Sequence, residues 1–279
     1  MGRTTTLVLI AAILALLAVY EPGLRQTGHD SLPLTRLAPK DINNIVVERP
    51  GRDAIELKRT ARGWRLVAPF TASANPLKAS ALASLAGART NVWYEAEAAD
   101  ARALALDPPA ARVRLNNVEL QFGGVETLRD LRYVKVEDRV ALLKDRFFHH
   151  IAASPSAFVD PVLIPKSVEL IAIRVPGASL RRIDGEWQFN PGSAFASEAT
   201  VEAFVSRWQV AAAMSVRTMD YQLNWRDAAH ITTAERGSYT LQVATAPGRV
   251  LLGDAQLDLQ YELPLAAGTA LLDPNVTTN

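Results

Sequence analysis

An internal duplication constrains the fold of this chain more than any other feature of its sequence. Two stretches share one order of features: an apolar strand, a Pro-Gly turn, a second strand with alternating apolar residues, and a tryptophan near a glycine. In the first copy these features lie at residues 45–47, Pro50-Gly51, 55–59 and Gly63-Trp64. In the second copy they lie at residues 171–173, Pro176-Gly177, 180–183 and Gly185-Glu186-Trp187. The duplication therefore predicts two similar units in tandem.

A helix is predicted after the tryptophan in each copy. Asn75 is a favourable N-cap and Pro76 a favourable first helical residue, and an apolar stripe with helical spacing follows them. This stripe consists of Leu77, Ala81, Leu85 and Ala88. Its counterpart begins at Ser197 and consists of Val201, Phe204, Val205 and Trp208. We therefore expect one main packed helix in each unit.

Further strands are predicted after each helix, because alternating apolar residues are separated there by turn residues. In the first copy they are residues 113–115, 118–122, 132–136 and 139–143, with turns at Asn116-Asn117 and Glu137-Asp138. In the second copy they are residues 239–244, 249–252, 257–263 and 269–272. This alignment matches Tyr133 with Tyr261, and residues 141–143 with residues 270–272. The predicted fold class is α+β, in which each unit is an antiparallel sheet with one main helix.

A proline-dense segment from Ser154 to Pro165 separates the two copies. We place the domain boundary near residue 161, inside this segment. The first α+β repeat unit then comprises residues 34–160 and the second comprises residues 161–279. Residues 23–33, which are rich in chain-breaking residues, form a tether in front of the first unit.

Residues 1–22 are predicted to form a membrane anchor. No charged residue lies between Thr4 and Tyr20, and a helix of that length rises about 25 Å, near the lower limit for crossing a bilayer. A cleaved signal peptide is one alternative, but the end of the run lacks a small-residue cleavage pattern. A buried core helix is the other, but the run is apolar on every side. We therefore expect an N-terminal transmembrane helix.

The flanking charges predict the orientation of this anchor. Arg3 lies on its N-terminal side and Glu21 follows it, so the N-terminus is expected in the cytoplasm of a bacterial cell. The chain would then be a single-pass inner-membrane protein with its bulk in the periplasm. Ala11, Ala15 and Ala18 share one helical face, and small residues of this kind let another membrane helix pack closely. They are the candidate contact with a polytopic membrane partner.

Composition excludes several classes of function. The 279 residues include 30 Lys and Arg against 29 Asp and Glu, and a net charge of +1 gives no field that attracts nucleic acid. The absence of Cys excludes disulfides, thiolate metal sites and cysteine nucleophiles. The sequence has no Walker loop, dinucleotide-binding glycine motif, nucleophile elbow or zinc-protease helix motif. We expect no cofactor and no enzymatic activity.

The titratable residues offer little for catalysis or metal binding. His149 and His150 are adjacent, and adjacent side chains point in different directions, so they rarely chelate one ion together. Glu95 and Glu97 would share a strand face, but their alanine neighbours fit a solvated edge. A hydrolase that uses dispersed acids remains a third hypothesis. Its residues would be Glu95, Asp107 and Asp160.

Arginines and aromatic residues supply the remaining candidates. Four arginines of the first copy form a possible anion-binding group for phosphate or carboxylate: Arg52, Arg59, Arg62 and Arg65. Interleaved acidic residues make an ordinary mixed-charge sheet face the alternative. The repeated aromatic residues are predicted to pack in the core of each unit. They are Trp64, Trp187, Tyr133 and Tyr261.

Short motifs connect the chain to a known family. They are the segment Leu34-Thr35-Arg36-Leu37-Ala38-Pro39-Lys40-Asp41-Ile42, the run Gly63-Trp64-Arg65-Leu66-Val67-Ala68-Pro69, Arg132-Tyr133-Val134 and Phe158-Val159-Asp160. With these motifs the chain resembles an uncharacterised bacterial family of membrane-anchored extracytoplasmic proteins that carry a domain of unknown function. The resemblance covers most of residues 31–272. It implies an envelope accessory role beside ABC-type transporters or gliding-type auxiliary proteins, without a particular chemistry.

Two functions follow as expectations. The first is a non-enzymatic, membrane-tethered extracytoplasmic accessory or scaffold protein of an envelope complex, with a polytopic membrane protein as partner. The alternative is a ligand-binding module that holds an envelope glycan or lipid in the cleft between the two units.

Overall fold

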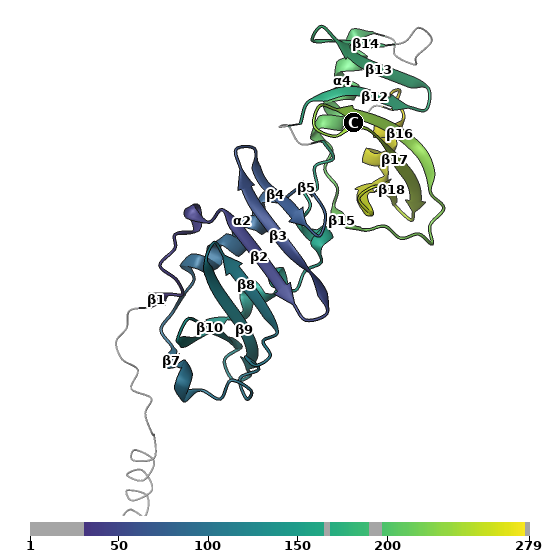
Figure 1. Ribbon diagram of the computed structural model, residues 1–279. Helices are drawn as coiled ribbons and strands as arrows, with labels where there is room; N and C mark the ends of the chain where they lie inside the picture. The colour runs from purple at the N-terminus through teal and green to yellow at the C-terminus, as the bar shows by residue number, and fades with distance from the viewer. Residues whose placement is uncertain (1–30, 165–167, 190–196, 277–279) are drawn as a thin grey trace, which may run out of the picture.

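The computed structural model describes residues 31–164, 168–189 and 197–276, and within them the strands form three antiparallel sheets. Two of the sheets are large, with nine and eight strands, and they follow one another along the chain (Figure 1). The third is a small pairing of β1 (Leu32–Pro33) with β6 (Arg89–Thr90). We call the nine-stranded sheet with its helices the first unit, and the eight-stranded sheet with its helices the second unit.

The first large sheet is built from short antiparallel strands. They are β2 (Asn44–Arg49), β3 (Arg52–Thr60), β4 (Gly63–Ala68), β5 (Ala72–Ser73), β7 (Trp93–Glu95), β8 (Ala111–Leu115), β9 (Val118–Glu126), β10 (Leu131–Val136) and β11 (Arg139–Lys144). Their order across the sheet is β5-β4-β3-β2-β8-β9-β10-β11-β7. Consequently β5 and β7 lie at opposite edges.

The second large sheet repeats this topology. Its strands are β12 (Leu170–Val175), β13 (Ala178–Ile183), β14 (Glu186–Phe189), β15 (Ser215–Thr218), β16 (Arg226–Thr233), β17 (Gly237–Ala246), β18 (Arg249–Asp254) and β19 (Leu259–Pro264). Their order is β14-β13-β12-β16-β17-β18-β19-β15. Apart from the extra strand β5, each strand of the first sheet has a counterpart at the same place in the chain and in the sheet. The two units are therefore copies of one topology.

The helices are few and short. Among the described residues they are α2 (Pro76–Ala83), α3 (Phe148–Ile151), α4 (Glu198–Val210) and α5 (Leu265–Leu272). Short 3₁₀ turns are η1 (Pro39–Asp41), η2 (Ser84–Gly87), η3 (Ala96–Ala98), η4 (Asp145–Phe147) and η5 (Pro155–Phe158). Each unit has one longer helix at the same place in the chain. Helix α2 lies between β4 and β7, and helix α4 lies between their counterparts β14 and β15. Both begin as predicted: the Asn75 side chain accepts from the backbone N–H groups of Leu77 and Lys78, and the Ser197 side chain accepts from that of Thr200.

The predicted α+β fold class is wrong, because the chain is mostly β-sheet with three antiparallel sheets. The predicted first helix is shorter than its apolar stripe. It ends at Ala83, and the stripe continues through the 3₁₀ turn η2 to Ala88, which is already extended. Three-residue periodicity in a 3₁₀ turn keeps Leu85 on the buried side, so the stripe alone does not distinguish the two conformations.

The predicted alignment of the C-terminal strands is also wrong. Residues 269–272 belong to helix α5 and not to a strand. Helix-favouring Ala and Leu fill this segment, and Pro264 stands at its N-cap. As a result, Tyr133 on β10 and Tyr261 on β19 occupy different places in the shared topology, since β19 is the counterpart of β11.

The predicted N-terminal transmembrane helix, with Ala11, Ala15 and Ala18, lies outside the described residues. Within the described part of the chain, no helix combines the length and apolar character needed to cross a bilayer. The domain boundary predicted near residue 161 falls in the segment between η5 and β12.

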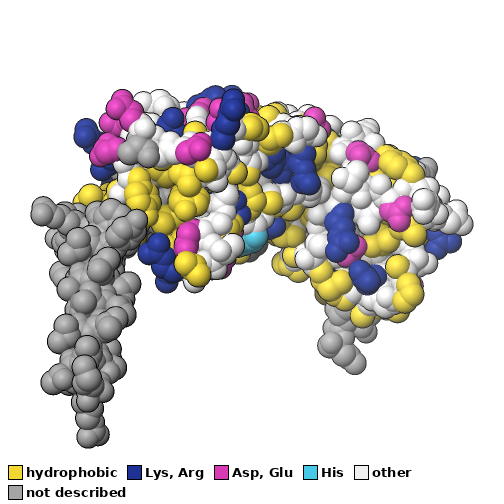
Figure 2. All heavy atoms as spheres, turned by 90° about the horizontal axis from the view of Figure 1, so that it is seen from below, with side chains coloured by type: hydrophobic (Ala, Val, Ile, Leu, Met, Phe, Trp, Pro, Cys, Tyr) yellow, Lys and Arg dark blue, Asp and Glu magenta, His cyan; other side chains and the backbone are white. Residues whose placement is uncertain are grey.

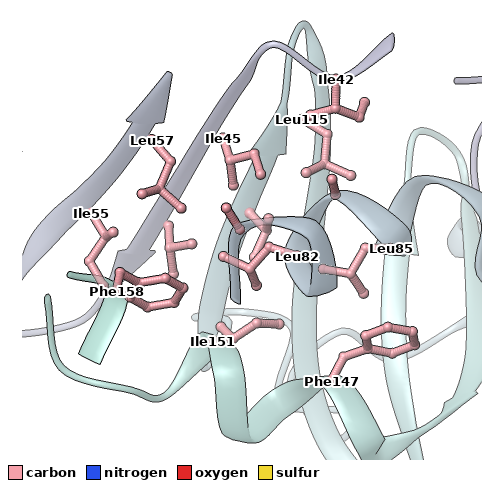
Figure 3. Packing of buried hydrophobic residues seen from close by; sticks show 14 of the residues in the cluster. Ile42, Ile45, Ile55, Leu57, Leu82, Leu85, Leu115, Phe147, Ile151 and Phe158 are labelled. Carbon is pink, nitrogen blue, oxygen red and sulfur yellow. The ribbon is translucent and has the colours of Figure 1, made fainter. Parts of the chain in front are cut away.

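The core of the first unit lies between its sheet and its helices (Figure 3). Alternate residues of the strands point toward α2, as the two-residue period of a strand requires. Ile45 of β2, with Ile55 and Leu57 of β3, faces Leu82 of α2, and all four are fully buried. The second unit has a corresponding core in which α4 supplies its four predicted apolar residues, Val201, Phe204, Val205 and Trp208.

The two units share part of one core. Ala213 and Val216, at and before β15, and Leu259 of β19 belong to the buried cluster of the first unit. The edge strand β15 of the second unit therefore packs against the first unit near η5. This packing gives the two units a fixed relation in the structure, and it positions the cleft described next.

Candidate functional site

A cleft of 730 Å³ lies where the two units meet. This volume lies within the range of about 300–1,000 Å³ that is typical of small-ligand sites. Residues of both units and of the linker between them line the cleft. From the first unit they are Thr60, Ala61, Arg62, Gly63, Trp64, Arg65, Thr71, Ala72, Ser73, Ala74 and Pro76; from the linker, Val159, Asp160, Val162, Leu163, Ile164 and Val168; and from the second unit, Thr233, Glu235, Arg236, Tyr239, Leu257 and Tyr261.

The linker is held by backbone hydrogen bonds to both units. On the first unit, the N–H of Asp160 donates to the carbonyl of Ser73 at 2.9 Å. On the second unit, the N–H of Leu163 donates to the carbonyl of Ala211 at 3.0 Å, and the N–H of Ala213 donates to the carbonyl of Pro161 at 2.8 Å. The linker, which forms one side of the cleft, is thus held in place by both units.

An ion pair crosses the cleft from one unit to the other. Nη1 of Arg62, in the turn between β3 and β4, lies 2.6 Å from Oε1 of Glu235, in the turn between β16 and β17. It is the one ion pair between the two units among the described residues. The Arg62 side chain is 66% exposed and that of Glu235 29% exposed, so water screens their attraction.

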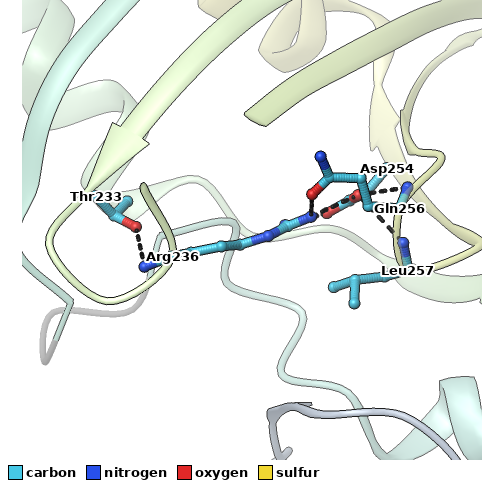
Figure 4. Close-up of polar contacts among 5 residues, drawn as sticks. All are labelled: Thr233, Arg236, Asp254, Gln256 and Leu257. Carbon is cyan, nitrogen blue, oxygen red and sulfur yellow. Dashed lines mark hydrogen bonds and ion pairs between the residues drawn. The ribbon is translucent and has the colours of Figure 1, made fainter. Parts of the chain in front are cut away.

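A second ion pair supports the wall of the cleft from within the second unit (Figure 4). Arg236 binds both carboxylate oxygens of Asp254, whose side chain is 2% exposed, and it also donates to Oε1 of Gln256 at 2.8 Å. Oδ1 of Asp254 accepts further from the backbone N–H groups of Gln256 and Leu257. Several donors therefore compensate this carboxylate for its loss of water. The Arg236 guanidinium lies over the ring of Tyr239, 4.0 Å from its centroid.

Three titratable groups at the cleft are perturbed by burial. Burial raises the pKa of Tyr239 to about 12 and raises the pKa of Tyr261 well above its usual range. Burial also raises the pKa of the Asp160 carboxyl, and the hydrogen bond from the backbone N–H of Val162 opposes this shift. Both tyrosines therefore remain neutral hydroxyl groups at any physiological pH.

The four arginines predicted to bind an anion do not form one group. Arg62 and Arg65 line the cleft. Arg59 lies instead over the Trp64 ring, 4.7 Å from its centroid, and its Nε donates to the carbonyl of Ile42. Arg52, at the far end of β3, donates to the carbonyl of Ala152. On the face shown in Figure 2, basic side chains are interspersed with acidic and apolar ones.

The repeated tryptophans occupy equivalent strands, β4 and β14. Trp64 is 8% exposed and pairs across the sheet with Arg59, whereas Trp187 is partly buried and pairs with Arg182. Tyr261 packs against the cores of both units. Trp64 and Tyr261 thus combine core packing with a place on the cleft.

The remaining predicted candidates are not brought together. Glu95 ends β7, at the sheet edge opposite β5, to which Asp160 is bonded. The ring centroids of His149 and His150 lie 3.7 Å apart with the ring planes tilted by 43°, and burial lowers the pKa of His150. Across residues 31–164, 168–189 and 197–276, no group of three or more His, Asp or Glu side chains has metal-binding geometry.

Sequence reasoning missed the residues that the second unit contributes, above all Glu235, Arg236, Tyr239 and Asp254. Arg236 lies in the turn before β17, and Asp254 ends β18, so their pairing depends on the strand order. No periodicity or motif in the sequence indicates that order. The turn residues around Gly237 were the available signal, but they identify a hairpin and not its partner.

Comparison with known proteins gives a family and no function. The chain matches the family described as a domain of unknown function, DUF4340, over residues 64–203. This match begins in β4 and ends in α4, so it includes the linker and parts of both units. No curated protein and no solved structure matches the chain. Because the match covers half of its length, the chain belongs to the DUF4340 family of proteins with a domain of unknown function.

Proposed function

We propose that this chain is a non-enzymatic accessory or scaffold protein of a bacterial envelope complex, and that it acts by binding through the cleft between its two units. The single observation that carries this proposal is that both units and the linker contribute to one cleft of 730 Å³. Sites at the junction of two domains are common places for recognition.

The roles of the charged groups support binding over catalysis. Arg62 is paired with Glu235, and Arg236 is paired with Asp254, so these groups position the walls of the cleft. The acids of the hydrolase hypothesis lie on separate elements: β7 holds Glu95, and the linker holds Asp160. Paired charges of this kind stabilise a shape, whereas general acid–base catalysis needs groups free to exchange protons with a substrate.

The proposed setting is the outer face of the bacterial inner membrane. The uncharged stretch between Thr4 and Tyr20 in the sequence would hold the chain there, with the described units in the periplasm. A polytopic membrane protein, such as the membrane subunit of a transporter, is the proposed partner.

Purification after crosslinking tests this function. The full-length protein is crosslinked in membranes, purified, and analysed by mass spectrometry together with its N-terminus. We expect an intact N-terminus and a stoichiometric membrane protein. This companion should be lost when Arg65, which lines the cleft, is changed to Glu. It should be retained when the exposed Asp138, which does not line the cleft, is changed to Lys. A cleaved N-terminus without any companion would contradict the proposal.

A second candidate function is the binding of an envelope glycan or lipid in the same cleft. The size of the cleft favours this candidate, because a protein partner could also dock on a flat surface, whereas a hollow of this volume suits a small ligand.

A further inference from the structure

The polar groups of the cleft distinguish between the possible ligands. The hydroxyl groups of Tyr239 and Tyr261 make no hydrogen bond to any described residue, and neither is sealed from solvent. The Asp160 carboxylate uses Oδ1 to accept from the backbone N–H of Val162 at 3.0 Å, and its other oxygen has no partner in the described part of the chain. The cleft thus offers two donors and one acceptor that only water or a ligand can satisfy.

These three groups lie close to one another. Asp160, Tyr239 and Tyr261 line the same cleft. Burial is the main cause of the raised pKa of Tyr261, and Tyr239 and Asp160 add to it. Asp160 comes from the linker, whereas the two tyrosines come from β17 and β19. A single ligand in the cleft could therefore contact all three groups at once.

The charges around the cleft balance. Arg62 and Arg236 are already paired with Glu235 and Asp254, which leaves Arg65 as the cation lining the cleft without an ion pair among the described residues. Asp160 opposes that single charge. A multiply charged anion such as a phosphate headgroup would need to displace existing ion pairs, so the cleft is not suited to it.

An acyl chain also fits poorly. It would remove water from Tyr239, Tyr261 and Asp160 without replacing any hydrogen bond, and buried polar groups without partners cost free energy. A ligand rich in hydroxyl groups satisfies both donors and the acceptor. The aromatic surfaces of Trp64 and the two tyrosines can meanwhile contact its apolar faces.

We propose that the cleft between the units binds a neutral oligosaccharide, which accepts hydrogen bonds from the hydroxyls of Tyr239 and Tyr261 and donates one to the Asp160 carboxylate. This proposal rests on the ligand-binding candidate of the proposed function and assigns the chemical class of the ligand. It makes the two tyrosines specificity-determining residues, because they contribute their hydroxyl groups and not only their rings.

Calorimetric titration of the purified protein tests the proposal. The probes are chitotetraose and maltotetraose as neutral oligosaccharides, sodium laurate as an acyl chain, and inorganic phosphate as an anion. The variant Y239F/Y261F removes both hydroxyls and keeps both rings. The control Tyr94→Phe makes the same change at a tyrosine on β7, which does not line the cleft. Thermal unfolding of each variant shows that it is folded.

We expect one of the tetrasaccharides to bind, with affinity at least tenfold weaker in Y239F/Y261F and unchanged in the Tyr94→Phe control. Equal affinity of the double variant and the wild type overturns it. If laurate binds instead, and Leu257→Asp abolishes that binding, the cleft is a ligand site but the oligosaccharide assignment fails. If no probe binds, the oligosaccharide assignment and the ligand-binding candidate both fail, while the companion found after crosslinking still decides the accessory function.

Discussion

Nη1 of Arg62 and Oε1 of Glu235 lie 2.6 Å apart, and this contact joins a turn of the first unit to a turn of the second. The two residues are far apart in the sequence, and each comes from a hairpin tip that also lines the cleft. The pair is exposed, so it orients the two walls more than it stabilises the fold.

Removing this pair should have a small effect on stability. We expect Arg62→Ala to lower the free energy of unfolding by less than about 1 kcal/mol, because exposed ion pairs contribute about that much at most. The charge-swapped variant R62E/E235R should recover most of the loss. Urea denaturation measures both values. A loss several times larger than this limit would show that the pair contributes substantially to the stability of the fold.

The buried pair of the second unit should behave differently. Asp254→Ala leaves the half-buried Arg236 without its bidentate partner, and such a break costs about 3–5 kcal/mol. Glu169→Ala is a matched control, since Glu169 pairs with Arg182 in an exposed setting and should cost less than about 1 kcal/mol. Chemical denaturation of both variants checks the contrast. Equal losses would mean that burial does not distinguish the two pairs.

The buried tyrosines should make the fold sensitive to alkali. The pKa of Tyr239 is about 12 in the folded state, against 10.0 for an exposed tyrosine. The contribution of Tyr239 to folding stability is therefore complete well below pH 10 and is lost as pH rises from 10 toward 12, because this tyrosine ionises there only in the unfolded chain. The slope is about 1.4 kcal/mol per pH unit for each such tyrosine.

Y239F/Y261F should flatten that alkaline decline, while Tyr94→Phe should leave it intact. Unfolding by urea at a series of pH values between about 9 and 11 measures the slope. If the double variant keeps the wild-type slope, the two hydroxyls are not the groups that couple folding to pH.

Close packing of α5 on β18 gives another prediction. A Cβ at Gly268 would collide with the Cβ of Val250 and would lie 2.8 Å from both of its Cγ atoms, so Gly268→Ala should destabilise the protein by about 1–3 kcal/mol through overpacking. The double variant G268A/V250G removes the whole obstructing side chain, including its Cβ. It should be no less stable than Val250→Gly alone, as thermal unfolding would show, and an additive loss would argue against a steric cause.

Local features of the fold could be predicted from the sequence because a few residues determine them. Gly51 and Gly177 adopt positive φ angles in the two Pro-Gly turns, and Asn116 does so in the turn between β8 and β9. The helix starts at Asn75 and Ser197 follow from side-chain capping, which involves only neighbouring residues. These signals located the repeat and most strand boundaries of its first half.

Features that depend on distant residues could not be predicted in this way. The stripe through Ala88 is compatible with an α-helix or a 3₁₀ turn, and the apolar run before Leu272 is compatible with a helix or a strand. The cleft depends on which hairpins become neighbours across the linker. The cluster of arginines in the first copy makes Arg62 and Arg65 candidates, but the partner of Arg62, Glu235, becomes identifiable only from the packing of one unit on the other.

Site-specific photo-crosslinking of the full-length chain in bacterial cells tests whether the protein binds through the cleft between its units. A photoreactive residue replaces Arg65, which lines the cleft, or the exposed Asp138, in the turn between β10 and β11. We expect a covalent adduct from position 65, of protein or of glycan as identified by mass spectrometry, and none from position 138. Adducts from position 138 with none from position 65 would contradict the claim that the chain acts through the cleft between its units.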